Sequence, residues 1–228
     1  MSDKVVKLFE KEGGEFITPP SAFIEKLKGV KAILFDWDGV FNDGYKKGGE
    51  GSPFSEIDAM GGNLLRYALW KINGVLSKVA VITGENNPPA QTLAQREHFH
   101  DLYFLAKNKS ISFKAFCDKH SLKPHEVLFF FDDVLDLEVA RQCGVRVMIR
   151  RRSNPMMNNF VTTNGLVDYL TAHDGGHSGL REGCELVMGL LGVYDEILKE
   201  RSTLSEKYKA YLTARNQIQT TITQQKEN

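Results

Sequence analysis

Five short apolar runs, separated by longer and more polar stretches, constrain the fold of this chain more than any other feature. The runs lie at residues 31–35, 79–83, 102–105, 127–131 and 145–149. Runs of this length, bounded by turn residues, are typical of buried strands, and the stretches between them are typical of helices. Strands that alternate with helices predict an α/β fold, in which a doubly wound parallel sheet carries helices on both faces.

Three of these runs end in side chains that can do chemistry. Asp36 and Asp38 follow the first run, Thr83 ends the second, and Asp132 and Asp133 follow the fourth. Parallel sheets bind ligands beyond the carboxyl ends of their strands. We therefore expect polar groups from distant segments to converge in a catalytic site at one edge of the sheet.

The composition limits the partners and the location of the protein. The 228 residues carry 29 basic and 29 acidic side chains, so no net charge favours a nucleic-acid partner. The N-terminus is too charged for a signal peptide, no apolar run reaches the length of a membrane span, and the three cysteines are widely spaced. We expect a cytoplasmic protein with reduced thiols that binds neither nucleic acid nor membrane.

The converging side chains suit an attack on a phosphate monoester. Such an anion requires a nucleophile, a cation, a proton donor for the leaving group and donors to the phosphoryl oxygens. Asp36 can be the nucleophile and form an aspartyl-phosphate, and Asp38 can be the general acid and base. Asp36 and Asp132 can bind Mg²⁺ through oxygen, the ligand type that this cation prefers. Thr83 can donate a hydrogen bond to phosphate, and Lys109 can supply positive charge.

Four elements of the sequence resemble, in order and spacing, the motifs of the haloacid dehalogenase superfamily. They are Phe35-Asp36-Trp37-Asp38-Gly39-Val40, Ile82-Thr83-Gly84, Lys109 and Asp132-Asp133-Val134-Leu135-Asp136. The resemblance implies a Rossmann-like core with Mg²⁺ bound by Asp36, the backbone carbonyl of Asp38, and Asp132. About 47 residues separate the first two motifs, which leaves no room for a separate cap domain. Residues 40–57, rich in Gly, Lys and Ser, predict a small β-hairpin flap.

Three further segments resemble a branch without a cap, the sugar-acid phosphatases of the 3-deoxy-D-manno-octulosonate 8-phosphate phosphatase family. They are Asp36-Trp37-Asp38-Gly39-Val40-Phe41-Asn42-Asp43-Gly44, Asp58-Ala59-Met60-Gly61 and Gly175-Gly176-His177-Ser178-Gly179-Leu180-Arg181-Glu182. The resemblance implies that Asp58, Gly84 and Arg181 bind substrate. It also implies a homotetramer, in which a neighbour's hairpin at residues 40–57 and loop at residues 175–182 help to close the site.

The residue after Thr83-Gly84 distinguishes two groups within this family. Octulosonate enzymes usually carry Arg there, whereas a related branch acting on 2-keto-3-deoxynononate 9-phosphate carries Glu, with a basic residue eleven positions on. This chain has Glu85 and Arg96 at those places. The resemblance implies that both contact the substrate and favour the nine-carbon acid, although a solvated surface pair would also explain them.

Phe131 departs from the pattern of the family, which has Gly before the first Asp of the fourth motif. A bulky ring there could crowd the metal site or lie in the core. Ser178 replaces a Gly in the C-terminal loop, and the flap has Ser52 and Ile57 where basic residues are common. Two alternatives to a sugar-acid phosphatase therefore stay open: a catalytically weak assembly or regulatory domain, and a phosphatase for another small monoester.

We divide the chain into an N-terminal arm at residues 1–28, a catalytic domain at residues 29–192 and a C-terminal helical extension at residues 193–228. Six apolar side chains of the extension follow alternating three- and four-residue steps if Arg201 and Arg215 fill the two gaps between them. They are Ile197, Leu204, Tyr208, Tyr211, Ile218 and Ile222. The stripe that they form can pack on the core of its own chain or on a neighbouring subunit, and we favour the second interpretation.

Overall fold

The computed structural model describes residues 2–225, and its framework is one eight-stranded sheet. The strand order is β1-β7-β6-β5-β2-β3-β4-β8, and only the pair β1 and β7 is antiparallel. The strands are β1 (Glu15–Phe16), β2 (Ala32–Phe35), β3 (Lys78–Ile82), β4 (Asp101–Phe104), β5 (Val127–Phe131), β6 (Val145–Met148), β7 (Tyr169–Leu170) and β8 (Thr221–Gln224). The predicted α/β fold with a parallel sheet is confirmed.

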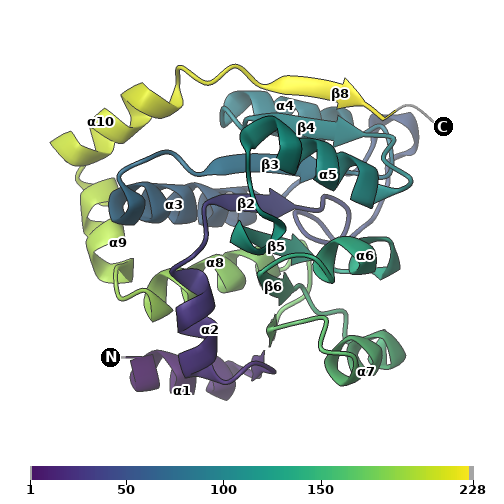
Figure 1. The fold of residues 1–228 in the computed structure, drawn as a ribbon, viewed down its shortest axis with the longest axis horizontal. Helices are drawn as coiled ribbons and strands as arrows, with labels where there is room; N and C mark the ends of the chain where they lie inside the picture. The colour runs from purple at the N-terminus through teal and green to yellow at the C-terminus, as the bar shows by residue number, and fades with distance from the viewer. Residues whose placement is uncertain (1, 226–228) are drawn as a thin grey trace.

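Helices cover both faces of this sheet (Figure 1). One face packs against α2 (Pro20–Leu27), α3 (Glu56–Asn73), α4 (Pro88–Arg96) and α8 (Gly179–Leu190). The other face packs against α5 (Lys109–His120), α6 (Leu137–Ala140) and α7 (Pro155–Thr163). The N-terminal helix α1 (Ser2–Glu12) lies against α8, outside these two layers.

The alternation of side chains along β2 explains why its sequence is apolar throughout. Ile33 and Phe35 lie in the core shared with α3 and α8, whereas Ala32 and Leu34 lie in the core shared with α5. All four side chains are fully buried, as expected for a parallel strand covered on both faces.

The position of β2 brings three strand ends together. It lies between β3 and β5, and its last residue, Phe35, pairs with Val81 on one side and Phe130 on the other. The strands are parallel, so the residues that follow them emerge at the same edge. Asp36, Thr83 and Asp132 are those residues.

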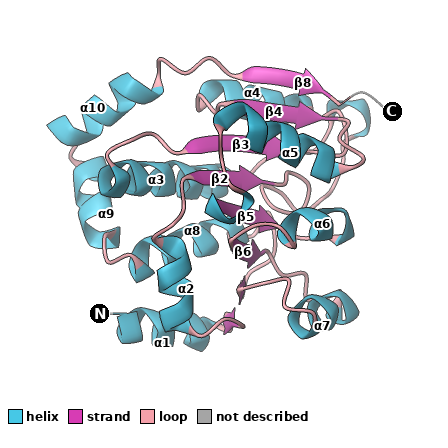
Figure 2. Cartoon of the chain, in the orientation of Figure 1, coloured by secondary structure: helices cyan, strands magenta, loops and turns pink. Residues whose placement is uncertain are grey.

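The connection from β2 to α3 differs from the predicted β-hairpin flap. Residues 36–55 contain turns and a short 3-10 helix at Gly48–Glu50 but no strand (Figure 2). Four of the five glycines in this segment take positive φ angles, which interrupt an extended backbone. The segment is tied to its surroundings instead: Trp37 Nε1 donates to the carbonyl of Ser52 at 3.2 Å, and Ser52 N donates to the Asn87 side chain at 3.2 Å. The prediction of a hairpin is wrong, because turn geometry outweighs strand pairing here.

Both ends of the chain contribute edge strands that the sequence analysis did not predict. In the N-terminal arm, β1 pairs with β7. In the C-terminal extension, β8 pairs with β4 (Figure 1). The extension is therefore not helical throughout, because β8 follows α9 (Tyr194–Ser202) and α10 (Glu206–Arg215). Pairing with β8 satisfies the exposed backbone groups of β4, which would otherwise be an open sheet edge.

The aromatic stripe of the extension packs on the core of its own chain. Tyr208 and Tyr211 of α10 approach Tyr67 of α3 with ring centroids 5.0 and 5.1 Å apart, and Tyr211 also approaches Trp70 at 5.6 Å. Glu200 of α9 accepts a hydrogen bond from Tyr67 Oη. The interpretation that this stripe packs on a neighbouring subunit is wrong for both tyrosines, because the apolar surface of α3 already covers them.

Replacing Tyr211 with Ala tests this packing. Tyr211 is 1% exposed, so the change leaves a cavity between α10 and α3. We expect the free energy of unfolding to fall by about 3–5 kcal/mol. Urea denaturation measures the loss, with Met156→Ala as the control because Met156 is 79% exposed. A loss below about 1 kcal/mol would mean that α10 adds little to the core.

Candidate active site

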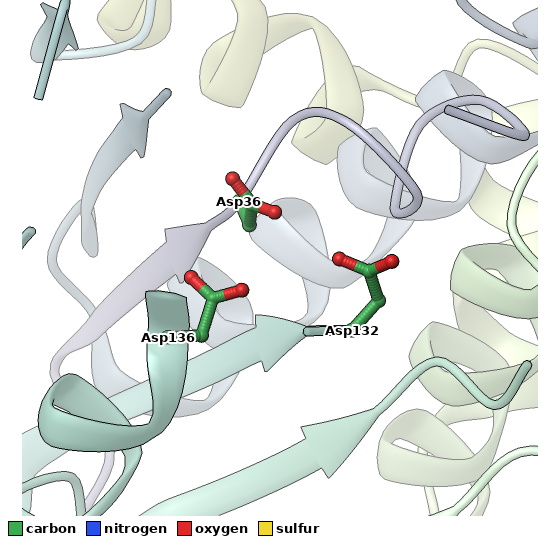
Figure 3. Close-up of side chains that lie close together, drawn as sticks. All are labelled: Asp36, Asp132 and Asp136. Carbon is green, nitrogen blue, oxygen red and sulfur yellow. The ribbon is translucent and has the colours of Figure 1, made fainter. Parts of the chain in front are cut away.

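Three buried carboxylates converge at the carboxyl edge of the sheet (Figure 3). Asp36 follows β2, Asp132 follows β5, and Asp136 ends the 3-10 helix Val134–Asp136. Each offers an oxygen, and these oxygens all lie within 4.8 Å of one another. None of the three residues is more than 4% exposed. Negative charges that are this close together and this deeply buried repel one another strongly unless cations balance them.

Lys109 supplies one of the balancing charges. Its Nζ lies 2.5 Å from Asp36 Oδ1 and 2.7 Å from Asp136 Oδ1, and the residue is 4% exposed. Lys109 opens α5, whose start is fixed by the Asn108 side chain accepting a hydrogen bond from Ser110 N. The helix start therefore carries the ammonium group to the acidic cluster.

Lys109 does not fully balance the charge of the carboxylates, and the pKa values of Asp36 and Asp132 stay raised. Burial raises the pKa of Asp36 well above its usual value, and repulsion from Asp136 adds to the effect while Lys109 opposes it. Burial also raises the pKa of Asp132 to about 7, again with a contribution from Asp136. Burial would lower the pKa of Lys109, but attraction to Asp136 and Asp36 outweighs it and raises that pKa. A divalent cation would reverse the shifts of the carboxylates.

Asp132 has an oxygen that suits a metal ion. Its Oδ2 accepts a hydrogen bond from Arg151 Nε at 2.7 Å, whereas its Oδ1 is buried and has no hydrogen-bond partner among the described residues. A buried carboxylate oxygen without a partner is costly, and a hard cation with oxygen ligands would satisfy it. Asp36, Asp132 and Asp136 together therefore fit Mg²⁺.

Asp38 lies outside this cluster, on the turn that follows β2. Its Oδ1 accepts a hydrogen bond from Ser52 Oγ, its Oδ2 accepts one from Asn87 Nδ2 at 3.0 Å, and Lys46 Nζ lies 3.7 Å away. The side chain is 25% exposed, so a substrate can reach it. These contacts fix the carboxylate on the turn, where it is more exposed than that of Asp36.

Thr83 is linked to Asp38 through hydrogen bonds of the Asn87 side chain. The Thr83 hydroxyl is fully buried and accepts a hydrogen bond from Asn87 Nδ2 at 2.8 Å. Asn87 precedes α4 and thus connects Thr83, Asp38 and the backbone of Ser52. Gly84 lies half-buried on the turn between Thr83 and α4.

The Phe131 ring does not crowd the acidic cluster. It is fully buried in the core on the side of α5 and stacks on Phe129 with ring centroids 5.3 Å apart. Residues two apart on a strand share a face, so Phe131 follows Phe129 into the core, and only Asp132 turns toward the site. Of the two placements considered from the sequence, the structure has the one in the core.

Glu85 and Arg96 have separate partners in the described part of the chain. Glu85 is exposed on the turn after β3 and pairs with Lys107 at 2.5 Å. Arg96 ends α4 and binds Glu56, while its Nε donates to Glu97 at 2.8 Å. Glu85 thus lies on the same turn as Gly84, whereas Arg96 lies at the opposite end of α4 from Asn87.

Asp58 and Arg181 meet where α3 crosses α8. Asp58 is buried, and its Oδ1 accepts a hydrogen bond from the backbone N–H of Arg181 at 2.8 Å in the first turn of α8. The Arg181 guanidinium binds Glu185 at 2.6 Å. Asp58 therefore has a structural role at the start of a helix, beside any role in binding substrate.

The loop before α8 packs closely on the turn that carries Asp38. Any side chain at Gly175 would clash with the carbonyl oxygens of Gly39 and Asn42, so only glycine allows this approach. Ser178 adopts φ +71°, a left-handed conformation that favours glycine, and this explains the glycine of the family pattern at that position. Since this contact lies within one chain, the contact of the 175–182 loop with a neighbour stays a prediction.

The sequence analysis did not assign Asp136, Asn87 and Arg151 to the site. Asp136 stood in the motif Asp132-Asp133-Val134-Leu135-Asp136, where its three-residue offset from Asp133 places it one turn further on. Asn87 stood before two prolines, a sign of a helix start. Arg151 follows β6, a strand whose end carried no motif, so only the structure identifies it.

Comparisons with known proteins agree with this geometry. No family model matches the chain. In sequence it is similar to the 3-deoxy-D-manno-octulosonate 8-phosphate phosphatase KdsC of Escherichia coli (strain K12), with 27% identity over 174 residues that cover 76% of this chain and 87% of that protein. The KdsC of Salmonella typhi is also 27% identical, over 172 residues that cover 75% of this chain and 86% of that protein.

Solved structures share the fold. A hypothetical protein from Xanthomonas campestris superposes with a TM-score of 0.64 and 27% identity, and the match covers 79% of this chain and 93% of that one. The 3-deoxy-D-manno-octulosonate 8-phosphate phosphatase of Moraxella catarrhalis, solved in complex with magnesium ion, phosphate ion and KDO, has a TM-score of 0.63 at 22% identity and covers 78% and 96%. In its motifs, its sheet and its sequence the chain is thus similar to the haloacid dehalogenase superfamily, and within it to the capless 3-deoxy-D-manno-octulosonate 8-phosphate phosphatases.

Proposed function

We propose that the protein is a Mg²⁺-dependent phosphoric monoester hydrolase that acts on the phosphate of a small sugar acid. The observation that carries the proposal is the cluster of Asp36, Asp132 and Asp136 around the ammonium group of Lys109. The names of the relatives supply the substrate class, since they act on 3-deoxy-D-manno-octulosonate 8-phosphate. Mg²⁺, held by Asp36, Asp132 and Asp136 and by the carbonyl of Asp38, would neutralise charge on the phosphoryl group.

The chain's own residues account for two successive displacements at phosphorus. A carboxylate oxygen of Asp36 attacks phosphorus, the bond to the sugar oxygen breaks, and Asp38 gives that oxygen its proton. Asp38 then takes a proton from water, whose oxygen attacks the aspartyl-phosphate and releases inorganic phosphate and Asp36. Thr83 and Lys109 bind the phosphoryl oxygens throughout, and Ser52 and Asn87 hold Asp38 in position.

The location of Phe131 bears on the alternative of a catalytically weak assembly domain. That alternative was favoured by the possibility that the Phe131 ring crowds the metal site. With Phe131 in the core and the carboxylates within 4.8 Å of one another, an active phosphatase is the better-supported proposal.

A phosphatase assay on a panel of sugar phosphates tests this function. We expect phosphate release from sugar-acid phosphates with Mg²⁺ and none with EDTA. Asp36→Asn keeps the shape of the side chain but removes the nucleophile, so turnover should fall by roughly a thousand-fold or more while the protein stays folded. Asp118→Asn, on the exposed face of α5, is the control. Turnover by Asp36→Asn within about tenfold of wild type would contradict the assignment.

We also propose that Glu85 helps to choose between sugar acids. The phosphoryl-binding groups serve any monoester, so discrimination requires groups that contact the distal part of the sugar. Glu85 lies on the turn beside Gly84, and a carboxylate there accepts hydrogen bonds from hydroxyls but repels a substrate carboxylate. The proposal rests on Glu85 more than on Arg96, because Glu85 lies on the turn that follows Thr83, whereas Arg96 lies at the far end of α4.

Glu85→Arg is expected to shift the preference from the nine-carbon acid phosphate toward the eight-carbon one. The loss of one charged hydrogen bond corresponds to about ten- to a hundred-fold in the ratio of the two kcat/KM values. Glu138→Arg makes the same charge change on the exposed surface of α6 and should leave the ratio unaltered. An unmoved ratio in Glu85→Arg would mean that Glu85 is only a surface residue.

We propose that the protein acts in the cytoplasm as a homotetramer, in which residues 40–57 of one subunit shield the site of another. None of the described helices is long and apolar enough to cross a membrane.

Large apolar side chains are exposed in the segment of residues 40–57, at Tyr45 (69%) and Ile57 (59%), and beside the acidic cluster at Val134 (61%). Shielding the site from water would strengthen its electrostatic interactions with the phosphoryl group.

Light scattering at micromolar concentration should give the mass of four chains. Ile57→Glu places a charge on the proposed interface and should reduce that mass, whereas Met156→Glu should not, because Met156 is 79% exposed on α7, outside the proposed interface. A wild-type protein that is monomeric at this concentration contradicts the assembly but leaves the hydrolase proposal standing.

A further inference from the structure

Arg151 is the second cation of the acidic cluster, and the mechanism above assigns it no role. It lies just beyond β6, the strand next to β5, and its Nε donates to Asp132 Oδ2 at 2.7 Å. Its Nη1 donates to the carbonyl of Asp43 at 3.3 Å. The Arg151 side chain is 29% exposed whereas that of Asp132 is 1% exposed, so the guanidinium group covers Asp132 from the solvent side.

The two neighbouring arginines have other partners. Arg150 Nη2 lies 2.8 Å from Glu15 Oε1 of β1, and Arg152 Nη2 donates to the carbonyl of Ala172 at 3.2 Å. Only the middle residue of the triplet Arg150-Arg151-Arg152 contacts the acidic cluster. The position of Arg151 is therefore a specific feature of the site, and Arg152 offers a matched control.

The guanidinium group is closely enclosed by the turn that carries Asp38. A side chain on Gly39 would clash with both Asp132 Oδ2 and Arg151 Nη2, and one on Gly44 would approach Arg151 Nη2 to 2.7 Å. Glycine at these two positions leaves the space that the guanidinium group occupies. Arg151 thus fills a built site between the catalytic turn and Asp132.

This arrangement places Arg151 in competition with a metal ion. Arg151 holds Oδ2 of Asp132, whereas Oδ1 has no hydrogen-bond partner among the described residues, so a cation at Oδ1 would share one carboxylate with a positive guanidinium group. Two positive charges on one small, buried carboxylate repel each other strongly. Without a metal, the same guanidinium group stabilises Asp132, because it balances a charge that is otherwise buried.

Asp174 is a candidate second acceptor for the guanidinium group. Its Oδ1 is buried without a hydrogen-bond partner among the described residues, and its charge acts on Arg151 together with those of Asp132 and Asp133. A shift of the guanidinium group toward Asp174 would release Asp132 without leaving Arg151 unpaired.

We propose that Arg151 is an internal counter-cation for Asp132 that competes with Mg²⁺, stabilises the metal-free protein and keeps metal binding weak and reversible, with Asp174 as its alternative partner. The proposal rests on the metal site proposed above. It makes Arg151 a positioning residue that acts through Asp132.

Isothermal titration calorimetry of the metal-free protein with MgCl₂, without substrate, tests the proposal. We expect Arg151→Met to bind Mg²⁺ about ten- to a hundred-fold more tightly than wild type, because the competing charge is gone. The melting temperature without metal should be lower than in wild type, and its rise on adding Mg²⁺ larger. Arg151→Lys keeps the charge and should stay near the wild-type Kd, as should Arg152→Met.

Asp174→Asn gives an independent test, with the opposite sign. It removes the negative charge of the alternative partner, so Arg151 should stay on Asp132 and Mg²⁺ should bind more weakly than in wild type. An unchanged or higher Kd in Arg151→Met overturns the proposal, and so does tighter binding in Asp174→Asn if Arg151→Met does not fold. If wild type binds Mg²⁺ and neither substitution changes the Kd, only this inference is wrong. If neither wild type nor any variant binds Mg²⁺, the proposed metal site itself is wrong.

Discussion

The burial of three carboxylates at one sheet edge is the constraint on which the rest of the site depends. Asp36, Asp132 and Asp136 repel one another in a region with little exposure to solvent, and the surrounding structure compensates with Lys109 on one side and Arg151 on the other. The compensation is incomplete, as the raised pKa of Asp132 and its unpartnered Oδ1 indicate. A site that is short of positive charge is suited to bind a divalent cation and, with it, a phosphate group.

The sheet makes this arrangement possible. The strand β2 is buried on both faces and lies between the parallel strands β3 and β5. The residues that follow these three strands therefore lie close together at one edge of the sheet. The layers of aromatic and aliphatic side chains fix the strands, and the phenyl ring of Phe131 contributes to the core rather than to the site. The turn at residues 36–55 then covers the strand ends, with glycines where Arg151 and the loop before α8 approach its backbone most closely.

The sequence predicted those parts of the structure that depend on short runs of neighbouring residues. The apolar runs predicted the central strands, and their polar ends located Asp36, Thr83 and Asp132 at a common edge. Side-chain pairings between distant segments carry no such signal, so the contact of Arg151 with Asp132 was missed. The hairpin was wrong because glycine-rich turns and hairpins have similar composition. The strand β8 was not predicted, and the packing of Tyr211 on α3 was the less favoured of two interpretations, because a stripe of apolar residues does not identify the surface that it covers.

The central claim is that Asp36 becomes phosphorylated during turnover, and trapping that intermediate tests it most directly. A reaction with a sugar-acid phosphate and Mg²⁺ is quenched in acid during steady-state turnover, and the peptides of the digested protein are analysed by mass spectrometry. We predict a phosphoryl group on the peptide that contains Asp36, and its loss when the quenched protein is treated with hydroxylamine, which cleaves acyl phosphates. Turnover with no phosphorylated peptide under conditions that preserve acyl phosphates, or with the phosphoryl group on another residue, would contradict the account.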